Sequence, residues 1–444
     1  MQFLLSDLAT ELNGRLSGPD VTVSGVSTDS RNIADGQLFV PIVAERDGHD
    51  YVPAALKGGA GGYLTSRPPQ KGSSIVVPDT AEALSELGRV ARRRLTAEVV
   101  GVTGSVGKTS VKDMIKSVCA ASKSTHVNVG SFNNEIGLPL TLANAPSDAE
   151  VTVTEMGARG IGHISHLCGI ALPTIGVVTT VALAHSELFG TIEAVAEAKG
   201  ELVESLPSSG TAILNAADPL VSAMAARTDA SVLTFGHGGD VHPSDVMFDS
   251  FRRARFVVNT HDERTEVSLN VSGEHMVFNA CAALATALSV GVSLEAAASG
   301  LSQLEMSPWR MEIDTTSTGL VVINDSYNAN PTSMRAALDT LYGLDAPNKV
   351  AAIGVMGELG DEGAAEHLNI VEEACSRGVD VLAIAAPQYG DSATHVKSID
   401  EAVSAIGPAG ADTAILVKGS RSAGLERLAT RLLADADDVD RTER

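Results

Sequence analysis

Residues 98–112 read EVVGVTGSVGKTSVK, an apolar stretch followed by a glycine-rich turn and a Gly-Lys-Thr-Ser sequence. The common nucleotide-binding loop carries another glycine five residues before the glycine of Gly-Lys-Thr, but this chain has Val102 there. In the shorter loop, the two glycines would let backbone N–H groups approach phosphate oxygens, and the lysine and threonine would reach phosphate and Mg²⁺. The simpler alternative to a phosphate-binding loop is a glycine turn capped by threonine that binds no nucleotide. A strand before the loop and a helix from about Ser110 favour nucleotide binding.

The length and composition are those of an ordinary globular protein. A chain of 444 residues suggests about three domains, and 44% hydrophobic with 20% charged residues is typical of globular proteins. The formal net charge of -23 argues against a protein that binds nucleic acid or anionic membranes non-specifically, because such binding requires a basic surface. An anionic ligand must therefore meet local clusters of Lys, Arg and backbone N–H groups.

The cysteines and the amino terminus favour a cytoplasmic location. The four cysteines are far apart and include no Cys-x-x-Cys pair, which predicts buried, reduced thiols rather than a zinc site. The opening residues, MQFLLSDLATEL, lack a basic leader and predict an amphipathic helix. No apolar stretch approaches the ~20 residues of a membrane span, so we expect no membrane insertion.

Three regions differ in their pattern of strands and helices, and together they predict an α/β fold with three domains. Residues 1–92 contain short strands and turns and predict a small N-terminal α/β domain. Residues 93–305 alternate apolar strands with helical stretches, which predicts a parallel sheet covered on both faces, like that of P-loop ATPases. Residues 306–444 contain a second such series and predict a Rossmann-like domain. A nucleotide at the carboxyl ends of these strands could lie between the two sheets and contact both.

Polar residues follow two of the predicted strands. Glu155 ends the strand VTVTE, where a carboxylate beside a phosphate loop could hold Mg²⁺, although an isolated acidic residue there is usually only part of a loop. The local sequence does not mark His185 or Lys199 as a ligand of a metal or nucleotide. A lone histidine and a helical lysine among glutamates are usually structural. Asp325 follows the strand VVIN, and the run from there to Pro331 is richer in hydrogen-bonding groups than a helix cap needs.

Together these segments resemble the Mur ligase family, and within it the type that adds D-alanyl-D-alanine to UDP-N-acetylmuramoyl-tripeptide. The resemblance covers essentially the whole chain, and the short phosphate loop is the form that this family uses. It is carried by STDSRNIADGQLFVPIVAERDGHDYVPAALKGGA at 27–60, GSVGKTS at 104–110, the strand ending at Glu155, AHSELFG at 184–190, AEAKGEL at 196–202, FNACAAL at 278–284, RMEI at 310–313, NDSYNANPTSMRAAL at 324–338 and LVKGSRSAGLERL at 416–428.

The resemblance implies an ATP-dependent amide synthesis. The γ-phosphoryl group of ATP would pass to a peptide carboxylate, and the free amine of D-alanyl-D-alanine would attack the resulting acyl phosphate. A carboxylate is a poor electrophile, so phosphorylation supplies the leaving group while the protein positions the reactants and neutralises charge. The implied cofactors are ATP and Mg²⁺, the implied partners are the two small-molecule substrates, and a monomer is expected.

The resemblance also implies a role for each matching residue. Phosphate contacts are implied for Gly104, Ser105, Val106, Gly107, Lys108, Thr109 and Ser110. Further ATP contacts are implied for Asn279, Arg310 and Asp325. Mg²⁺ ligands are implied at Thr109 and Glu155 and, for a second ion, at His185 and Lys199, with Lys199 carried as an N-carbamoylated side chain. Catalytic roles are implied for Lys108, Glu155, His185, Lys199 and Arg310.

Substrate contacts are implied in all three domains. The uridine diphosphate part would meet Thr28, Asp29, Ser30, Arg31, Gly48, His49 and Asp50. The sugar-peptide donor would meet Asn133 and Asn134, and the acceptor would meet Tyr327, Asn328 and Asn330. The chain departs from the family pattern at Val106, where asparagine is frequent, and at Trp309, where glycine is frequent. It also has Ser186 where the family usually has leucine after the histidine.

Other functions share parts of these motifs. The ligase that adds the third amino acid typically carries Asp-Asn-Pro-Arg, and this chain has Asn-Ala-Asn-Pro in the corresponding loop. A folate polyglutamate ligase should lack the uridine-binding domain, and a GTPase should carry Asn-Lys-x-Asp, which is absent. An ATP-driven switch or binding module would use the loop without making a bond, and would need no amino-acid acceptor.

Overall fold

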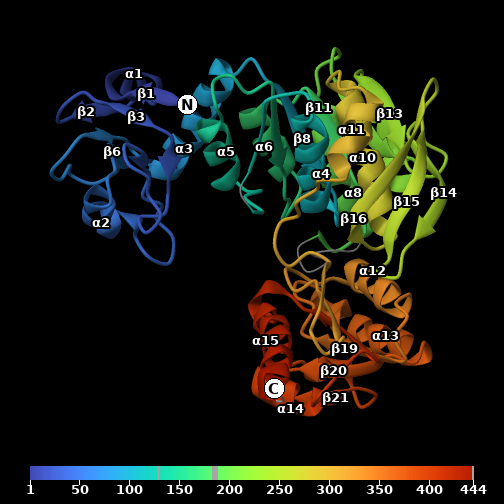
Figure 1. Cartoon of the computed structure of the whole chain (residues 1–444). Coiled ribbons are helices and arrows are strands. Elements are labelled where there is room, and N and C mark those ends of the chain that lie inside the picture. Colours follow the sequence, from blue (N-terminus) through green and yellow to red (C-terminus); the bar gives the residue numbers. More distant parts are fainter. Residues whose placement is uncertain (129, 183–188, 443–444) are drawn as a thin grey trace.

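The computed structural model describes residues 1–128, 130–182 and 189–442, with side chains through residue 434. The chain forms three lobes, which we call the N-terminal, central and C-terminal domains (Figure 1). The N-terminal domain lies beside the central domain, and the C-terminal domain lies below the central domain in this view. The α/β fold with three domains is thus confirmed. The boundaries at 92/93 and 305/306 stay predictions.

The N-terminal domain contains a five-stranded sheet in the order β2-β7-β6-β5-β4 and a separate antiparallel pair, β1 and β3. The helix expected from the first residue is wrong for residues 2–4, which form a strand. Phe3 is buried while its two neighbours are exposed, and this alternation has the period of a strand. The bounds are β1 Gln2–Leu4, α1 Leu5–Glu11, β2 Arg15–Ser17, β3 Thr22–Ser24, β4 Val26–Ser27, β5 Leu38–Phe39, η1 Gly48–Tyr51, α2 Val52–Lys57, β6 Gly62–Thr65 and β7 Ser74–Val76.

Helix α3 (Thr80–Arg94) joins the N-terminal domain to the central domain. The Asp79 side chain caps it by accepting hydrogen bonds from two backbone N–H groups of its first turn. Its leucines, such as Leu84, are buried in a cluster shared with α5 (Gly137–Asn144) and α6 (His163–Ala171). Burying a leucine stabilises by about 1.5–3 kcal/mol, so this helix fastens the two domains together.

The central sheet has six parallel strands in the order β13-β12-β11-β8-β10-β9. Strand β8 lies inside it, and its three valines are fully buried. Core clusters on the two faces contain α4, α10 and α11 on one side and α5, α6 and α8 on the other, which confirms a sheet covered on both faces. The further bounds are β8 Glu98–Thr103, α4 Lys108–Ala120, β9 Thr125–Val127, β10 Val151–Glu155, β11 Ile175–Val178, α8 Ile192–Glu204, β12 Thr211–Asn215, α9 Pro219–Ser222, η2 Ala223–Arg227, β13 Ser231–Phe235, α10 His275–Ser289 and α11 Leu294–Leu301.

A three-stranded antiparallel sheet, which we did not predict, extends the central domain. It consists of β14 (His242–Phe248), β15 (Arg253–Asn259) and β16 (Arg264–Ser272). In β15 every second side chain from Ala254 is buried, so the chain alternates between core and solvent. That period of two was readable in the sequence RARFVVN.

The C-terminal domain contains a six-stranded sheet in the order β17-β18-β22-β19-β20-β21. Five strands are parallel, as a Rossmann-like domain requires, and β17 is an antiparallel edge strand that we did not predict. The bounds are β17 Glu312–Thr315, β18 Val321–Asn324, α12 Pro331–Tyr342, β19 Asn348–Ile353, η3 Gly360–Glu362, α13 Gly363–Ser376, β20 Asp380–Ile384, η4 Pro387–Tyr389, β21 Thr394–Val396, α14 Ile399–Ile406, β22 Thr413–Lys418, η5 Arg421–Ala423 and α15 Glu426–Thr442.

Two whole-chain expectations have structural outcomes. All four cysteines are free, and burial raises the pKa of the Cys119 and Cys168 thiols to about 12. Cys281 is also buried, but Cys375 is exposed, so the expectation that every thiol is buried is wrong for that residue. Among the helices of the described residues, none combines the length and the apolar composition that crossing a membrane requires.

Candidate active site

The phosphate-loop sequence forms a tight turn between β8 and α4. Helix α4 begins at Lys108, two residues before the expected start, because Gly107 takes a left-handed conformation (φ 85°) and ends the loop. Gly104 has φ 146°, and a Cβ atom there would lie 1.8 Å from the Thr179 hydroxyl oxygen. Only glycine therefore fits at position 104. The turn brings the first backbone N–H groups of α4 to the wall of a cavity, as an anion site requires.

Residues that follow β11 fix the shape of this loop. The Ser105 N–H donates to the Thr180 carbonyl (2.8 Å), and the Ser105 hydroxyl donates to the Ala182 carbonyl (2.8 Å). The Thr179 hydroxyl donates to the Val106 carbonyl (2.6 Å). Sequence reasoning missed both threonines, although they directly follow a buried strand at the edge where parallel sheets bind ligands.

Thr109 and Glu155 meet as the sequence predicts for neighbouring strand ends. The Thr109 hydroxyl donates to one carboxylate oxygen of Glu155 (2.8 Å), and the Asn133 amide donates to the other (2.8 Å). Glu155 is only 1% exposed. Hydroxyl and carboxylate oxygens are hard donors that suit Mg²⁺, so the residues present fit that ion. The described residues contain no cluster of three His, Cys, Asp or Glu side chains arranged for a metal, so phosphate or water would complete its coordination.

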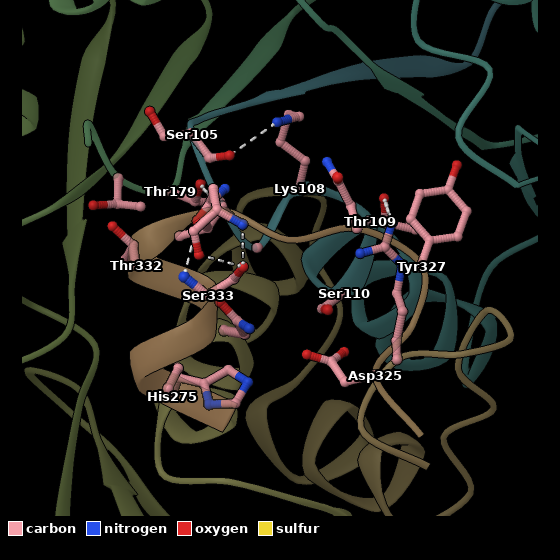
Figure 2. A pocket seen from close by; sticks show the side chains of 18 of the residues that line it. Ser105, Lys108, Thr109, Ser110, Thr179, His275, Asp325, Tyr327, Thr332 and Ser333 are labelled. Carbon is pink, nitrogen blue, oxygen red and sulfur yellow. Dashed lines mark hydrogen bonds between the residues drawn. The ribbon is translucent and has the colours of Figure 1, made fainter. Parts of the chain in front are cut away.

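Two lysines lie at this end of the central domain, and Figure 2 shows Lys108 projecting beside the loop. Its ammonium donates to the Gly104 carbonyl (2.6 Å). Burial lowers the pKa of Lys108, the Glu155 carboxylate opposes that shift, and the Arg310 charge adds to it. Lys199 on α8 is 4% exposed and has no hydrogen bond or ion pair with any described residue. Burial, and secondarily the charge of Lys108, lower the pKa of Lys199 well below its ordinary value.

The opposite wall of the cavity comes from the C-terminal domain. The Asp325 carboxylate pairs with the Lys418 ammonium (2.5 Å) and accepts a hydrogen bond from the Met311 N–H (3.2 Å). Lys418 is 2% exposed and also donates to the Asn328 carbonyl (2.8 Å). Asn330 caps α12 by accepting from the Ser333 N–H (2.9 Å).

Arg310 connects the two walls. One nitrogen of its guanidinium donates to the hydroxyls of Thr109 (2.8 Å) and Ser131 (3.3 Å) in the central domain. The guanidinium carbon lies 4.2 Å from the centre of the Tyr327 ring, which belongs to the C-terminal domain. Figure 2 shows Tyr327 beside Thr109, with Asp325 and His275 farther from the loop.

These residues enclose a cavity of about 810 Å³ between the central and C-terminal domains. The predicted site residues that line it are Ser105, Val106, Gly107, Lys108, Thr109, Ser110, Asn133, Glu155, Asn279, Arg310, Asp325, Tyr327, Asn328 and Asn330. Gly104, Asn134 and Lys199 are not in its wall. The Asn134 side chain accepts from the N–H groups of Ile136 and Gly137 and so caps α5. His185 lies outside the described residues.

The residues expected to hold uridine diphosphate lie in the N-terminal domain, outside the cavity. They are Thr28, Asp29, Ser30, Arg31, Gly48, His49 and Asp50. Hydrogen bonds from Arg31 lower the pKa of Asp29 to about 2. His49 is buried and contacts Asp47 (2.6 Å), and Asp50 pairs with Arg67 (3.0 Å).

Sequence reasoning missed several residues that line the cavity. Lys418 ends a buried strand, TAILVK, so the rule that ligands meet strand ends could have identified it. Arg159 follows Glu155 by four residues and has no side-chain hydrogen bond or ion pair with the described part of the chain. His275 begins α10, and burial lowers its pKa. No sequence signal marked Arg159 or His275.

Comparison with known proteins agrees with this arrangement. The Mur ligase middle domain matches residues 102–287, and the Mur ligase glutamate ligase domain matches residues 309–421. UDP-N-acetylmuramoyl-tripeptide--D-alanyl-D-alanine ligase of Mycobacterium tuberculosis H37Rv is 36% identical, with 92% of each chain covered. The Escherichia coli K12 protein of that name is 35% identical, over 96% of this chain and 98% of its own.

Solved structures give the same result for the whole fold. MurF from Acinetobacter baumannii superposes with a TM-score of 0.89 at 29% identity, over 98% of this chain and 99% of that chain. MurF ligase from Thermotoga maritima in complex with ADP superposes with a TM-score of 0.83 at 26% identity, over 94% of this chain and 98% of its own. Two matched domains, a short phosphate loop facing a second domain, and extensive identity lead to one conclusion: the chain belongs to the Mur ligase family.

Proposed function

We propose that this protein is an ATP-dependent ligase that joins D-alanyl-D-alanine to UDP-N-acetylmuramoyl-tripeptide. The observation that carries the proposal is the interdomain cavity, in which a phosphate loop faces a polar loop and a buried Lys-Asp pair. The curated relatives over nearly the whole chain bear the name of this activity. A structure with ADP bound, among those that share the fold, supports ATP as the nucleotide.

The reaction has two steps, phosphorylation of the peptide carboxylate and attack of the amine on the acyl phosphate. A carboxylate oxygen of the tripeptide attacks the γ-phosphorus of ATP, the bond to the bridging oxygen breaks, and ADP leaves. The amine of D-alanyl-D-alanine then attacks the acyl carbon, the C–O bond to phosphate breaks, and phosphate and a proton are released as the amide forms. A cavity between two domains can exclude water, which would otherwise hydrolyse the acyl phosphate.

The central domain supplies the charge that these steps need. The backbone N–H groups from Gly104 to Ser110 and the Lys108 ammonium would hold the phosphates. Thr109 and Glu155 would hold Mg²⁺, with His185 and Lys199 serving a second ion. When bound, Mg²⁺ neutralises phosphate charge and stabilises the oxygens of the transferring group.

Lys199 would enter this site in a modified form. A neutral amine is the form that adds to CO₂, and the lowered pKa of Lys199 favours that form at neutral pH. The new N–C bond gives a carbamic acid, which loses a proton to become an anion with two oxygens. An anion with oxygen donors would suit Mg²⁺, whereas an ammonium would repel it.

The remaining contacts divide among the three domains. Asn279, Arg310 and Asp325 would contact ATP, and Tyr327, Asn328 and Asn330 would line the acceptor site. Asn133 and Asn134 would contact the donor, whose uridine diphosphate would meet Thr28 to Arg31 and Gly48 to Asp50. We further propose domains at 1–92, 93–305 and 306–444, and a monomeric cytoplasmic enzyme that binds no nucleic acid.

The test is phosphate release from ATP by the purified full-length chain with Mg²⁺ and UDP-N-acetylmuramoyl-tripeptide, with and without D-alanyl-D-alanine. We expect release to require both substrates and the product mass to equal the pentapeptide. Release that ignores the dipeptide would contradict the proposal and favour a sibling ligase or an ATP-driven module. Replacing D-alanyl-D-alanine with diaminopimelate or glutamate separates those siblings.

A further inference from the structure

The Thr109 hydroxyl is fully engaged by neighbouring side chains. A hydroxyl has one proton to donate and two lone pairs that accept. Its proton goes to Glu155 (2.8 Å), and one lone pair accepts from the Arg310 guanidinium (2.8 Å). The Ser131 hydroxyl lies 3.2 Å away. Arg310 therefore directs its charge at the oxygen that would ligate Mg²⁺ in the proposed site.

Arg310 is positioned for this contact by both domains. Its guanidinium lies against the Tyr327 ring, 4.2 Å from the ring centre, while its buried Nε atom has no hydrogen-bond partner among the described residues. A buried N–H that finds no acceptor costs about 1–3 kcal/mol. A second position in which Nε finds an acceptor, such as a phosphate oxygen, would be favoured.

The backbone around Arg310 connects the domains. Before it, the Ser307 N–H donates to the Asp113 carboxylate on α4 (2.8 Å). After it, the Met311 N–H donates to Asp325 (3.2 Å). Trp309 and Met311 both have positive φ, 63° and 53°, a conformation that costs energy for residues with side chains. A change in the position of Arg310 would therefore alter the segment that links the two domains.

We propose that Arg310 competes with a divalent cation for the Thr109 hydroxyl: the guanidinium donates to this oxygen and leaves it when the metal binds. Arg310 and the metal compete for the same Thr109 oxygen and for the field of Glu155. Once displaced, the Arg310 guanidinium turns toward the bound nucleotide and carries the linking segment with it. The inference rests on the proposed function, because it takes Thr109 and Glu155 as the metal site.

The test measures Mn²⁺ binding to the full-length chain without nucleotide, by the loss of the free Mn²⁺ signal in electron paramagnetic resonance. Arg310→Met removes the competing charge and keeps an unbranched side chain. We expect this variant to bind Mn²⁺ at least about fivefold more tightly than the wild type, because one charge near Glu155 is gone. Arg310→Lys keeps the positive charge beside the site, so it should gain less Mn²⁺ affinity than Arg310→Met.

Arg159→Met is the matched control. Arg159 lines the same cavity with the same charge, and among the described residues no hydrogen bond or ion pair joins it to Thr109. An equal gain in both methionine variants would overturn the inference, because it would reflect bulk charge rather than competition. No gain, or a loss, in Arg310→Met would overturn it directly.

Two further measurements distinguish a failure of the proposed metal site from a failure of the competition between Arg310 and the metal. Thr109→Val should abolish the Mn²⁺ site; if it does not, the metal site of the proposed function is itself wrong. Trp309 is the only tryptophan and adjoins Arg310, so saturating Mg²⁺ should change its fluorescence in the wild type, independently of whether any variant folds. If Mg²⁺ left the Trp309 emission unchanged, the result would contradict the displacement of Arg310 from Thr109.

Discussion

Two buried lysines, Lys418 in the wall of the interdomain cavity and Lys199 on α8 outside that wall, share their burial and differ in their partners. Lys418 is 2% exposed and Lys199 is 4% exposed. The Lys418 ammonium meets the Asp325 carboxylate at 2.5 Å and the Asn328 carbonyl at 2.8 Å. Lys199 meets no hydrogen-bonding or charged partner among the described residues, and the charge of Lys108 acts on it unfavourably. Burial alone therefore does not define the state of a lysine; its partners do.

The difference has an energetic basis. Moving an ammonium out of water costs several kcal/mol, which a nearby carboxylate and further hydrogen bonds can offset. At Lys418 the offset is present, so the residue can be buried as a cation that holds the Asp325 loop in place. At Lys199 the described residues provide no such offset, and burial lowers the pKa.

The largest effect that this comparison predicts is on turnover. Lys199→Met should lower ligase turnover by about 10²–10³-fold, the loss typical of removing one electrostatic group from an active site. It should not lower the free energy of unfolding, because the described residues offer this ammonium no partner to lose and methionine removes the cost of burying an ionisable group. Steady-state kinetics and urea denaturation of the same preparation measure both. Full turnover, or a large loss of stability, would show that Lys199 is structural after all.

The second prediction concerns stability rather than turnover. Lys418→Met leaves the Asp325 carboxylate, whose side chain is 14% exposed, without its partner. We expect the free energy of unfolding of the C-terminal domain to fall by about 3 kcal/mol, because breaking a buried pair strands a charge. Urea denaturation followed by far-UV circular dichroism measures it.

A double variant supplies the control for this pair. Lys418→Met with Asp325→Asn removes both charges, so it should recover part of the stability lost in Lys418→Met alone. Additive losses would mean that the two residues do not stabilise each other, and the comparison between the two lysines would then fail.

The positions of these groups were only partly predictable from sequence. The apolar strands predicted the parallel sheets, and the Gly-Lys-Thr loop and Glu155 were expected at adjacent strand ends, where the structure places them. The antiparallel strands from β14 to β16 were missed, although β15 alternates with a period of two. This local strand signal lies between segments whose pattern is that of helices and parallel strands.

Side-chain partners were harder to predict because they depend on contacts between distant segments. Arg310 and Thr109 are 201 residues apart, and Lys418 and Asp325 are 93 apart. The hydrophobic periodicity of the sequence does not indicate such pairs. Lys199 shows that local pattern can also mislead. A helical lysine among glutamates predicts an exposed ion pair, but Lys199 is buried and has no partner among the described residues. Family resemblance identified Lys199 where its local pattern did not.

The smallest predicted effect is the contribution of Lys199 to the pH dependence of stability. Its folded-state pKa is lowered, so between that value and the unfolded value of about 10.4 the unfolded chain binds a proton that the folded chain does not. Stability must then rise with pH in that window, by up to about 1.4 kcal/mol per pH unit. Urea denaturation of the wild type and of Lys199→Met from pH 7 to pH 9, in CO₂-depleted buffer with EDTA, isolates this contribution by difference. The wild type should gain stability relative to the variant as pH rises. A constant difference would mean that Lys199 has a partner in the folded protein and is no different in kind from Lys418.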